Sequence, residues 1–162
     1  MTLESLGTTL EALQKNDVRF LIAGGLAVIA HGHLRVTHDL DLVLALEPEN
    51  TSKAIEALSA VGFQPRLPVR AMDFCDPQIR SKWIAEKNLQ VFSMISEPLG
   101  GFVIDIFAEE PFDFAEEFAS SIKKSLVGLD ESYPFVSKET LIRMKKLAGR
   151  SVDLDDIDKL NG

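Results

Sequence analysis

The chain contains a single cysteine and no long hydrophobic run. Cys75 is the only cysteine among 162 residues, so no internal disulfide can form and a reducing compartment is expected. No apolar segment approaches the roughly 18 residues that a membrane-spanning helix needs. The opening residues, MTLESLGTTLEALQ, lack the basic start and apolar centre of a signal peptide. We therefore expect a cytoplasmic protein that does not contact a membrane.

Basic residues are also in deficit. The chain has 17 lysines and arginines against 25 aspartates and glutamates, a formal net charge of −8. Broad, non-specific binding to nucleic acid depends on basic surface and is disfavoured, although a local basic groove stays possible. Apolar residues make up 46% and charged residues 26% of the chain. These values are typical of a soluble globular protein, and we expect one domain spanning residues 1–162.

Hydrophobic periodicity predicts interleaved helices and strands. Apolar spacing and capping residues predict helices over 2–15, directly after the glycine pair 24–25, and over 49–62, 112–119, 138–149 and 153–161. Strands are expected at 18–23, from 39 to near Pro48, and at 89–95 and 101–107, with extended chain at 63–70 and 121–136. Residues 71–87 give no clear pattern. The order indicates an α/β (α+β) fold, a small mixed β-sheet flanked by helices, with helices closing the chain.

The segment DLDLVLAL combines a buried face with two acids. Leucines at every second position from Leu40 to Leu46 predict one buried face, so Asp39 and Asp41 project together from the other. Carboxylates at this spacing lie roughly 6–7 Å apart, and their repulsion costs about 2–3 kcal/mol at an effective dielectric near 20. Solvation of the pair at the surface would relieve that repulsion, and a bound divalent cation would remove it.

Two further features lie close to these aspartates in the predicted fold. Gly24 and Gly25 stand between a strand and a helix, an arrangement that either makes a tight turn or lets phosphate approach free backbone N–H groups. Asp105 interrupts the apolar strand FVIDIF, with Ile104 and Ile106 on the opposite face. Three carboxylates from two strands are what a two-metal phosphoryl or nucleotidyl transfer site requires.

The pattern GG-x13-D-L-D, with a third aspartate on a later strand, resembles the signature of the nucleotidyltransferase superfamily, whose fold is similar to that of DNA polymerase β. GGLAVIAHGHLRVTHDLDLVL is most similar to its Gly-Gly branch, where R-x-T-x-D-[ILV]-D is typical. That branch includes aminoglycoside and lincosamide nucleotidyltransferases and abortive-infection-type toxins of toxin–antitoxin systems. LIRMKKLAGRSVDLDDIDKL resembles the closing helices of the toxin-like group.

The resemblance implies a Mg²⁺-dependent (or Mn²⁺-dependent) transfer of a nucleoside monophosphate from a nucleoside triphosphate (NTP) to an acceptor hydroxyl. The acceptor could be tRNA or another RNA, a protein or a small molecule, and an antitoxin protein is a possible partner. The catalytic and metal-binding residues implied are Asp39, Asp41 and Asp105, of which Asp105 could also act as general base.

The same resemblance implies a set of nucleotide-binding residues: Gly24, Gly25, Arg35, Thr37 and Lys146. The spacing of Arg143, Lys146 and Arg150 at i, i+3 and i+7 independently predicts one basic stripe along a helix. A solvated basic face is the simpler interpretation of that stripe, and we prefer it for Arg143. Asp153 and Asp156 are expected to cap a helix or pair with Arg150.

Two other functions remain open. A non-catalytic nucleotide-binding or scaffold protein could use the same fold, although such a protein need not keep all three carboxylates. The histidines His31, His33 and His38 lie beside the aspartates and could indicate a His/Asp metal-dependent hydrolase, because imidazole favours Zn²⁺, Mn²⁺ or iron. However, no second His–Asp pair completes such a site, so we favour the transferase.

Overall fold

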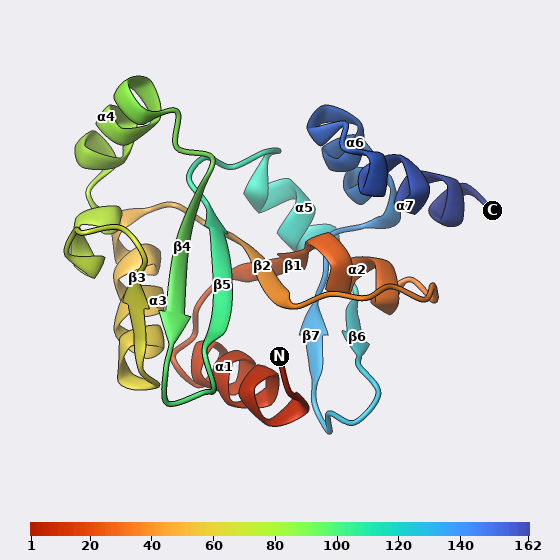
Figure 1. The fold of residues 1–162 in the computed structure, drawn as a ribbon, viewed down its shortest axis with the longest axis horizontal. Coiled ribbons are helices and arrows are strands. Elements are labelled where there is room, and N and C mark those ends of the chain that lie inside the picture. Colours follow the sequence, from red (N-terminus) through yellow and green to blue (C-terminus); the bar gives the residue numbers. More distant parts are fainter.

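A five-stranded mixed sheet forms the centre of the molecule (Figure 1). The structure is a computed structural model that describes all residues, 1–162. The strands of this sheet are β1 (Phe20–Ala23), β2 (Asp39–Leu44), β3 (Phe63–Pro65), β4 (Val91–Ser96) and β5 (Phe102–Phe107). Their order is β1-β2-β5-β4-β3, in which only the β2–β5 pair is parallel. A separate antiparallel pair consists of β6 (Lys123–Ser125) and β7 (Ser132–Pro134).

Seven α-helices and one 3-10 helix surround the sheets. In chain order they are α1 (Leu3–Lys15), α2 (Gly24–Ala30), α3 (Pro48–Ala60), η1 (Ala71–Cys75), α4 (Pro77–Lys87), α5 (Phe114–Ser120), α6 (Lys138–Ala148) and α7 (Ser151–Asn161). Several begin at side-chain caps that the sequence indicates: the Thr2 side chain accepts from Ser5 N at α1, and the Ser137 side chain accepts from Thr140 N at α6.

The predicted mixed α/β architecture is confirmed, with differences in detail. The strand from Asp39 ends at Leu44 rather than near Pro48, because the Asn50 side chain binds the Ala45 carbonyl and Pro48 begins α3. Residues 121–136 form the short β6–β7 ladder. Residues 71–87, which show no clear pattern, form η1 and α4; α4 starts at an Asp76 cap followed by Pro77.

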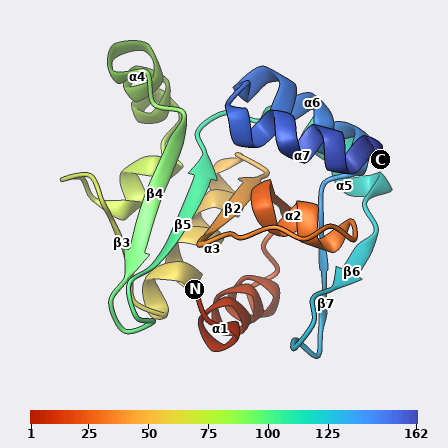
Figure 2. The same ribbon diagram turned by 45° about the vertical axis from the view of Figure 1, so that its right-hand side comes forward.

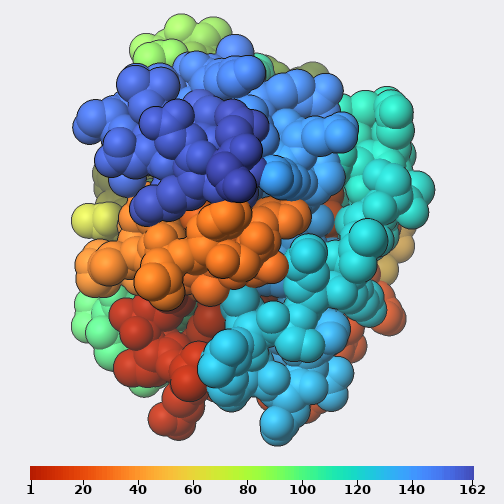
Figure 3. Space-filling view, turned by 90° about the vertical axis from the view of Figure 1, so that its right-hand side faces the viewer, coloured from red at the N-terminus to blue at the C-terminus, as the bar shows by residue number.

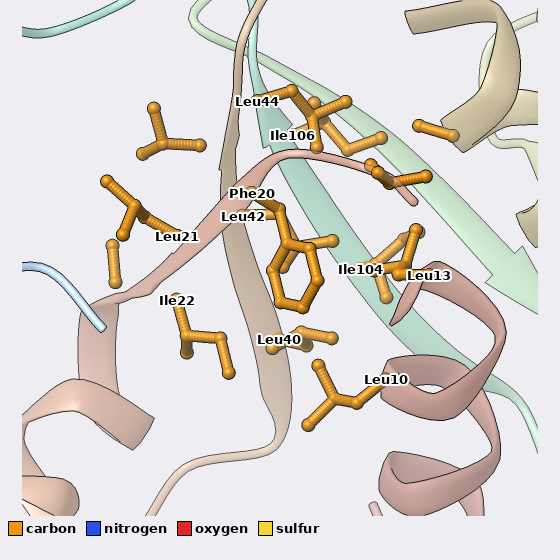
Figure 4. Packing of buried hydrophobic residues seen from close by; sticks show 14 of the residues in the cluster. Leu10, Leu13, Phe20, Leu21, Ile22, Leu40, Leu42, Leu44, Ile104 and Ile106 are labelled. Atoms are coloured by element: carbon orange, nitrogen blue, oxygen red, sulfur yellow. The ribbon is translucent and has the colours of Figure 1, made fainter. Parts of the chain in front are cut away.

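The central sheet has one apolar face and one face that carries acids. Leu40 and Leu42 are fully buried on β2, and Ile104 and Ile106 continue the same face on β5. Figure 4 shows these side chains with Leu10 and Leu13 of α1, which covers this face. Strand residues alternate between faces, so the aspartates of β2 and β5 must point to the opposite side.

The C-terminal helices lie over the acidic side of the molecule. Figure 2 shows α6 and α7 packed side by side above α2. In Figure 3 the residues of α2 and of the loop that follows it (orange) lie directly beneath α6 and α7 (blue). None of the helices combines the length and apolar character needed to cross a bilayer.

The buried face of β2 yields a stability prediction. Leu42 has 0% exposure, so Leu42→Ala should leave a cavity and lower the free energy of unfolding by about 2–5 kcal/mol. Leu34→Ala, at a side chain that is 93% exposed, is the matched control and should change it by less than about 0.5 kcal/mol. Urea unfolding followed by circular dichroism measures both. Equal midpoints for the two variants would contradict the assigned faces of the sheet.

Candidate active site

Asp41 and Asp105 face each other across the parallel strands. They are register partners in the β2–β5 ladder, and their outer neighbours in the same row are Ala23 on β1 and Ser93 on β4. Paired residues of neighbouring strands project to the same face, so the two carboxylates are adjacent. The Ser93 hydroxyl donates a hydrogen bond to Asp105 Oδ1. Asp39, two residues before Asp41, adds a third carboxylate to this face.

Nearby cations only partly compensate the negative charge of Asp39, Asp41 and Asp105 at the position of Asp41. Burial, together with the charges of Asp105 and Asp39, raises the pKa of Asp41 to about 6. The cationic side chains of Lys145 and Arg150 act in the opposite direction but do not cancel the effect. A carboxylate in such surroundings favours either a proton or a cation.

The two glycines are fitted closely to this group. Gly24 has φ +62°, and a Cβ built on it would lie 1.9 Å from Asp41 Oδ2. A Cβ on Gly25 would lie 2.7 Å from Thr37 Oγ1. Only glycine therefore allows Asp41 and Thr37 to approach the first turn of α2, and no side chain caps that turn.

Two contacts near its β2 end hold the loop between α2 and β2. The Thr37 hydroxyl donates to the Asp39 carbonyl at 3.3 Å, and the Arg35 guanidinium Nε lies 3.1 Å from Asp156 Oδ1 on α7. The structure thus places Thr37 behind Gly25 and Arg35 against the C-terminal helix.

A cavity of about 420 Å³ opens beside Asp41 and Gly24. Its polar wall includes Lys145, Arg150 and Asp153 from the C-terminal helices. The rest of the lining comes from α4, from β5, from the residues just after each of them, and from α6. It includes Ile84, Leu89, Gln90, Phe107, Glu109, Glu110, Leu141 and Met144. The lining therefore combines apolar side chains with two cations and with acids that include Glu109 and Glu110.

The structure places Lys145, rather than Lys146, in this cavity. Lys145 is 5% exposed, whereas the neighbouring Lys146 is exposed and does not line the cavity. The predicted basic stripe through Arg150 is wrong, because α6 ends at Ala148 and Gly149 turns the chain with φ +66°. Arg150 instead precedes α7 and reaches the cavity from there.

An ion cluster, buried at Lys145, Asp153 and Asp156 but exposed at Arg150, supports the charged part of the lining. Lys145 Nζ lies 2.7 Å from Asp156 Oδ2 and 3.6 Å from Asp153 Oδ1. Arg150 Nε lies 2.8 Å from Asp153 Oδ2, and the Asp153 side chain also accepts from Arg150 N. The expected pairing of Arg150 with Asp153 is confirmed, whereas Asp156 binds Lys145 and Arg35 instead.

The atoms that could bind a metal ion at this site are carboxylate oxygens. Carboxylates are hard ligands suited to Mg²⁺, which usually takes only one or two of them together with substrate phosphates. No group of three or more His, Cys, Asp or Glu side chains converges on one point, so the protein alone does not enclose a metal. The Nε2 atom of His31 contacts the Val136 carbonyl at 3.0 Å, and His38 is exposed. The His/Asp hydrolase therefore lacks a ligand set.

Lys145 and Ser93 lie at the candidate site although neither is predicted there from the sequence, and Arg150, expected in the basic stripe, joins them from outside α6. Lys145 follows Leu141 by four residues and so lies on the buried face of α6, a signal that the helical period does contain. Ser93 alternates with the buried Phe92 and Met94 on β4, which places it on the acidic face. Nothing in the local sequence indicates the ion pairs across Gly149, since they depend on the angle between two helices.

No family model matches the chain, and no curated protein is similar to it in sequence. Solved structures are similar in fold. The lincosamide antibiotic adenylyltransferase LnuA, bound to lincomycin, has a TM-score of 0.62 and 18% identity, with 100% of this chain and 98% of that chain covered. ANT(2")-Ia in complex with adenylyl-2"-tobramycin has a TM-score of 0.64 and 16% identity, covering 98% and 88%. A nucleotidyltransferase-like protein from Paracoccidioides brasiliensis has a TM-score of 0.56 and 16% identity, covering 99% and 77%.

The chain therefore has the fold of nucleotidyltransferases, as its Gly-Gly and D-L-D motifs predict. At these identities the likeness concerns the fold, and the site has to be argued from its own residues.

The carboxylate group yields a prediction about stability. In the presence of EDTA at pH 7, Asp41→Asn should raise the free energy of unfolding by about 1–3 kcal/mol, because it removes a buried charge repelled by its neighbours. The pKa of Asp41 is about 6 in the folded chain and about 3.9 in an unfolded chain. The folded state thus retains a proton that the unfolded state loses between these values, and the wild type loses stability as pH rises from about 4 to 6.

Urea unfolding at pH 4 and pH 7 measures this difference, with Asp155→Asn as control because Asp155 is exposed on α7. The gain from Asp41→Asn should be full above pH 6 and absent below about pH 4. A gain that is independent of pH would contradict the charge-based explanation.

Proposed function

We propose that the protein is a nucleotidyltransferase that moves a nucleoside monophosphate from an NTP to a hydroxyl group of a small molecule. The observation that carries the proposal is the arrangement of the cavity. Asp41, Gly24, Lys145 and Arg150 line one cavity, and Asp105 is the register partner of Asp41. Acids for cations, a glycine turn for phosphate and a buried lysine are the groups that a triphosphate requires.

In the proposed reaction the acceptor oxygen forms a bond to the α-phosphorus of the NTP as the bond from that phosphorus to the bridging oxygen of pyrophosphate breaks. Asp105 takes the proton that the acceptor hydroxyl loses, and the Ser93 hydroxyl orients Asp105 for this role. Backbone N–H groups at Gly24 and Gly25 and the charges of Lys145 and Arg150 hold the phosphates, and pyrophosphate leaves with the electron pair of the broken bond.

Asp39 and Asp41, with Asp105, would hold Mg²⁺ together with the phosphates of the nucleotide. When bound, the ion supplies positive charge to the triphosphate and lowers the barrier to in-line displacement. Arg35 and Thr37 support the glycine turn from behind in this proposal, and Lys145 takes the role that the resemblance assigned to Lys146.

A small molecule is the acceptor that the cavity favours. Its volume of about 420 Å³ lies within the range of small-molecule sites, and its lining combines apolar side chains with a few charged groups, as such sites do. The net charge of −8 disfavours RNA as acceptor. The similar solved structures include complexes with lincomycin and with adenylyl-2"-tobramycin, which supports an acceptor of this size. The toxin–antitoxin role and the cytoplasmic location stay predictions from the sequence.

The first test is binding followed by turnover. Titration calorimetry of each NTP with and without Mg²⁺ should detect Mg²⁺-dependent binding of at least one, and pyrophosphate release should then be measured across a panel of hydroxyl-bearing small molecules. Asp41→Asn should reduce turnover by about 10³-fold or more, because it removes a group needed at the reacting phosphate. Asp155→Asn should leave turnover unchanged, since Asp155 is exposed on α7.

Binding without turnover on any acceptor would favour the non-catalytic nucleotide-binding protein. Absence of binding by the folded wild type would reject both functions.

The neighbouring lysines provide a matched pair. Lys145→Gln should weaken NTP binding about 10–100-fold, because a buried charge-assisted hydrogen bond to phosphate contributes about 1.5–3 kcal/mol. Lys146→Gln removes the same charge at an exposed position and should change the dissociation constant by less than about twofold. Calorimetry at a temperature well below both unfolding midpoints provides the comparison. The reverse order would restore the assignment of Lys146.

A further inference from the structure

Asp156 has an unusual position for a residue outside the cavity. Its side chain is 0% exposed in the middle of α7, yet two cations from distant parts of the chain converge on it. Lys145 Nζ lies 2.7 Å from Oδ2, and Arg35 Nε lies 3.1 Å from Oδ1 and 3.2 Å from Oδ2. Burial alone would raise the pKa of this carboxyl, but hydrogen bonds and charges from Lys145 and Arg35 lower it, so Asp156 is ionised at neutral pH.

The two partners of Asp156 connect it to two parts of the site: the cavity lining and the loop beside the glycine pair. Lys145 lines the cavity itself. Arg35 does not line it, but stands two residues before Thr37, whose side chain contacts Gly25 closely enough to forbid a Cβ there. One carboxylate therefore connects the cationic wall on α6 with the loop that backs the glycine turn, as the contact between the orange and blue segments in Figure 3 illustrates.

The lysine keeps a donor for a ligand. An ammonium group has three N–H donors, and Asp156 accepts one at 2.7 Å while Asp153 lies at 3.6 Å. Every buried side-chain polar atom has a partner, and the Lys145 ammonium still has N–H donors beyond its one hydrogen bond to Asp156. Because Lys145 is held by two carboxylates at the end of a long side chain, its ammonium has a fixed position before any phosphate arrives.

We propose that Asp156 is a positioning residue for the nucleotide: it fixes the Lys145 ammonium at the cavity and, through Arg35, the loop that supports Gly25. This inference rests on the proposed function, since it assigns a role in binding the triphosphate. It extends that function to α7, which contributes only Asp153 to the cavity lining.

The test is a double-mutant cycle on the dissociation constant of the best-binding NTP with Mg²⁺, measured by calorimetry. Asp156→Asn should raise this constant about tenfold or more in the wild-type background. In the Lys145→Gln background the same change should raise it threefold or less, because the lysine that Asp156 positions is gone. Asp155→Asn, an equal change on the exposed side of α7, should have less than a twofold effect.

Equal fold-changes in the two backgrounds, or no effect of Asp156→Asn on a wild type that binds, would overturn the positioning role alone. No binding by the wild type would overturn both this role and the proposed function. Should Asp156→Asn not fold, Arg35→Gln replaces it: the Arg35 side chain is 21% exposed and lies outside the cavity. It should weaken binding about threefold or more, and unchanged binding would overturn the proposal.

Discussion

The repulsion between carboxylates on one face of the sheet is the constraint on which the rest of the site depends. Asp41 and Asp105 are adjacent because β2 and β5 are parallel and in register, and Asp39 lies one strand repeat away. Neighbouring groups accommodate these carboxylates. Ser93 donates a hydrogen bond to Asp105, Gly24 leaves room for Asp41, and the cations Lys145 and Arg150 from the C-terminal helices partly offset the charge. The pKa of Asp41 is still raised, so these contacts do not fully offset the repulsion between the carboxylates, and the site favours additional positive charge.

The C-terminal helices bring an ion cluster to these acids, in which Lys145, Asp153 and Asp156 are buried and Arg150 is 72% exposed. Three cations, Arg35, Lys145 and Arg150, share two carboxylates, Asp153 and Asp156. Burying such groups costs several kcal/mol per ion, and their mutual attraction repays that cost only with good geometry and full hydrogen bonding. A hydrophobic contact between α6 and α7 would stabilise the helix pair at least as well. The retention of a net positive cluster beside the acids therefore argues for a role in the site rather than for stability alone.

The sequence predicts the sheet and its acids because both follow from local rules. Alternating leucines fix which face of β2 is buried, and the same alternation places Asp39 and Asp41 together. The resemblance implies Lys146, but the predicted stripe from Lys146 to Arg150 does not form, because Gly149 ends the helix before Arg150. Asp156 and Arg35 are 121 positions apart in the sequence, so no hydrophobic periodicity could predict that they pair. Local patterns thus predict which face a residue occupies, whereas tertiary packing decides its partner.

The same contrast between local patterns and tertiary packing applies to the parts of the proposed site that would bind the phosphates and the acceptor. The acids lie on β2 and β5 and the two glycines at the start of α2, so the fold itself sets their geometry. The apolar wall of the cavity comes instead from Ile84 on α4, from Leu89, and from Met144 on α6. α4 arises in a region without a clear sequence pattern and carries none of the acids or glycines of the site. Under the proposed function, the acids and glycines would set the phosphate chemistry, and the apolar lining from α4 and α6 would select the acceptor.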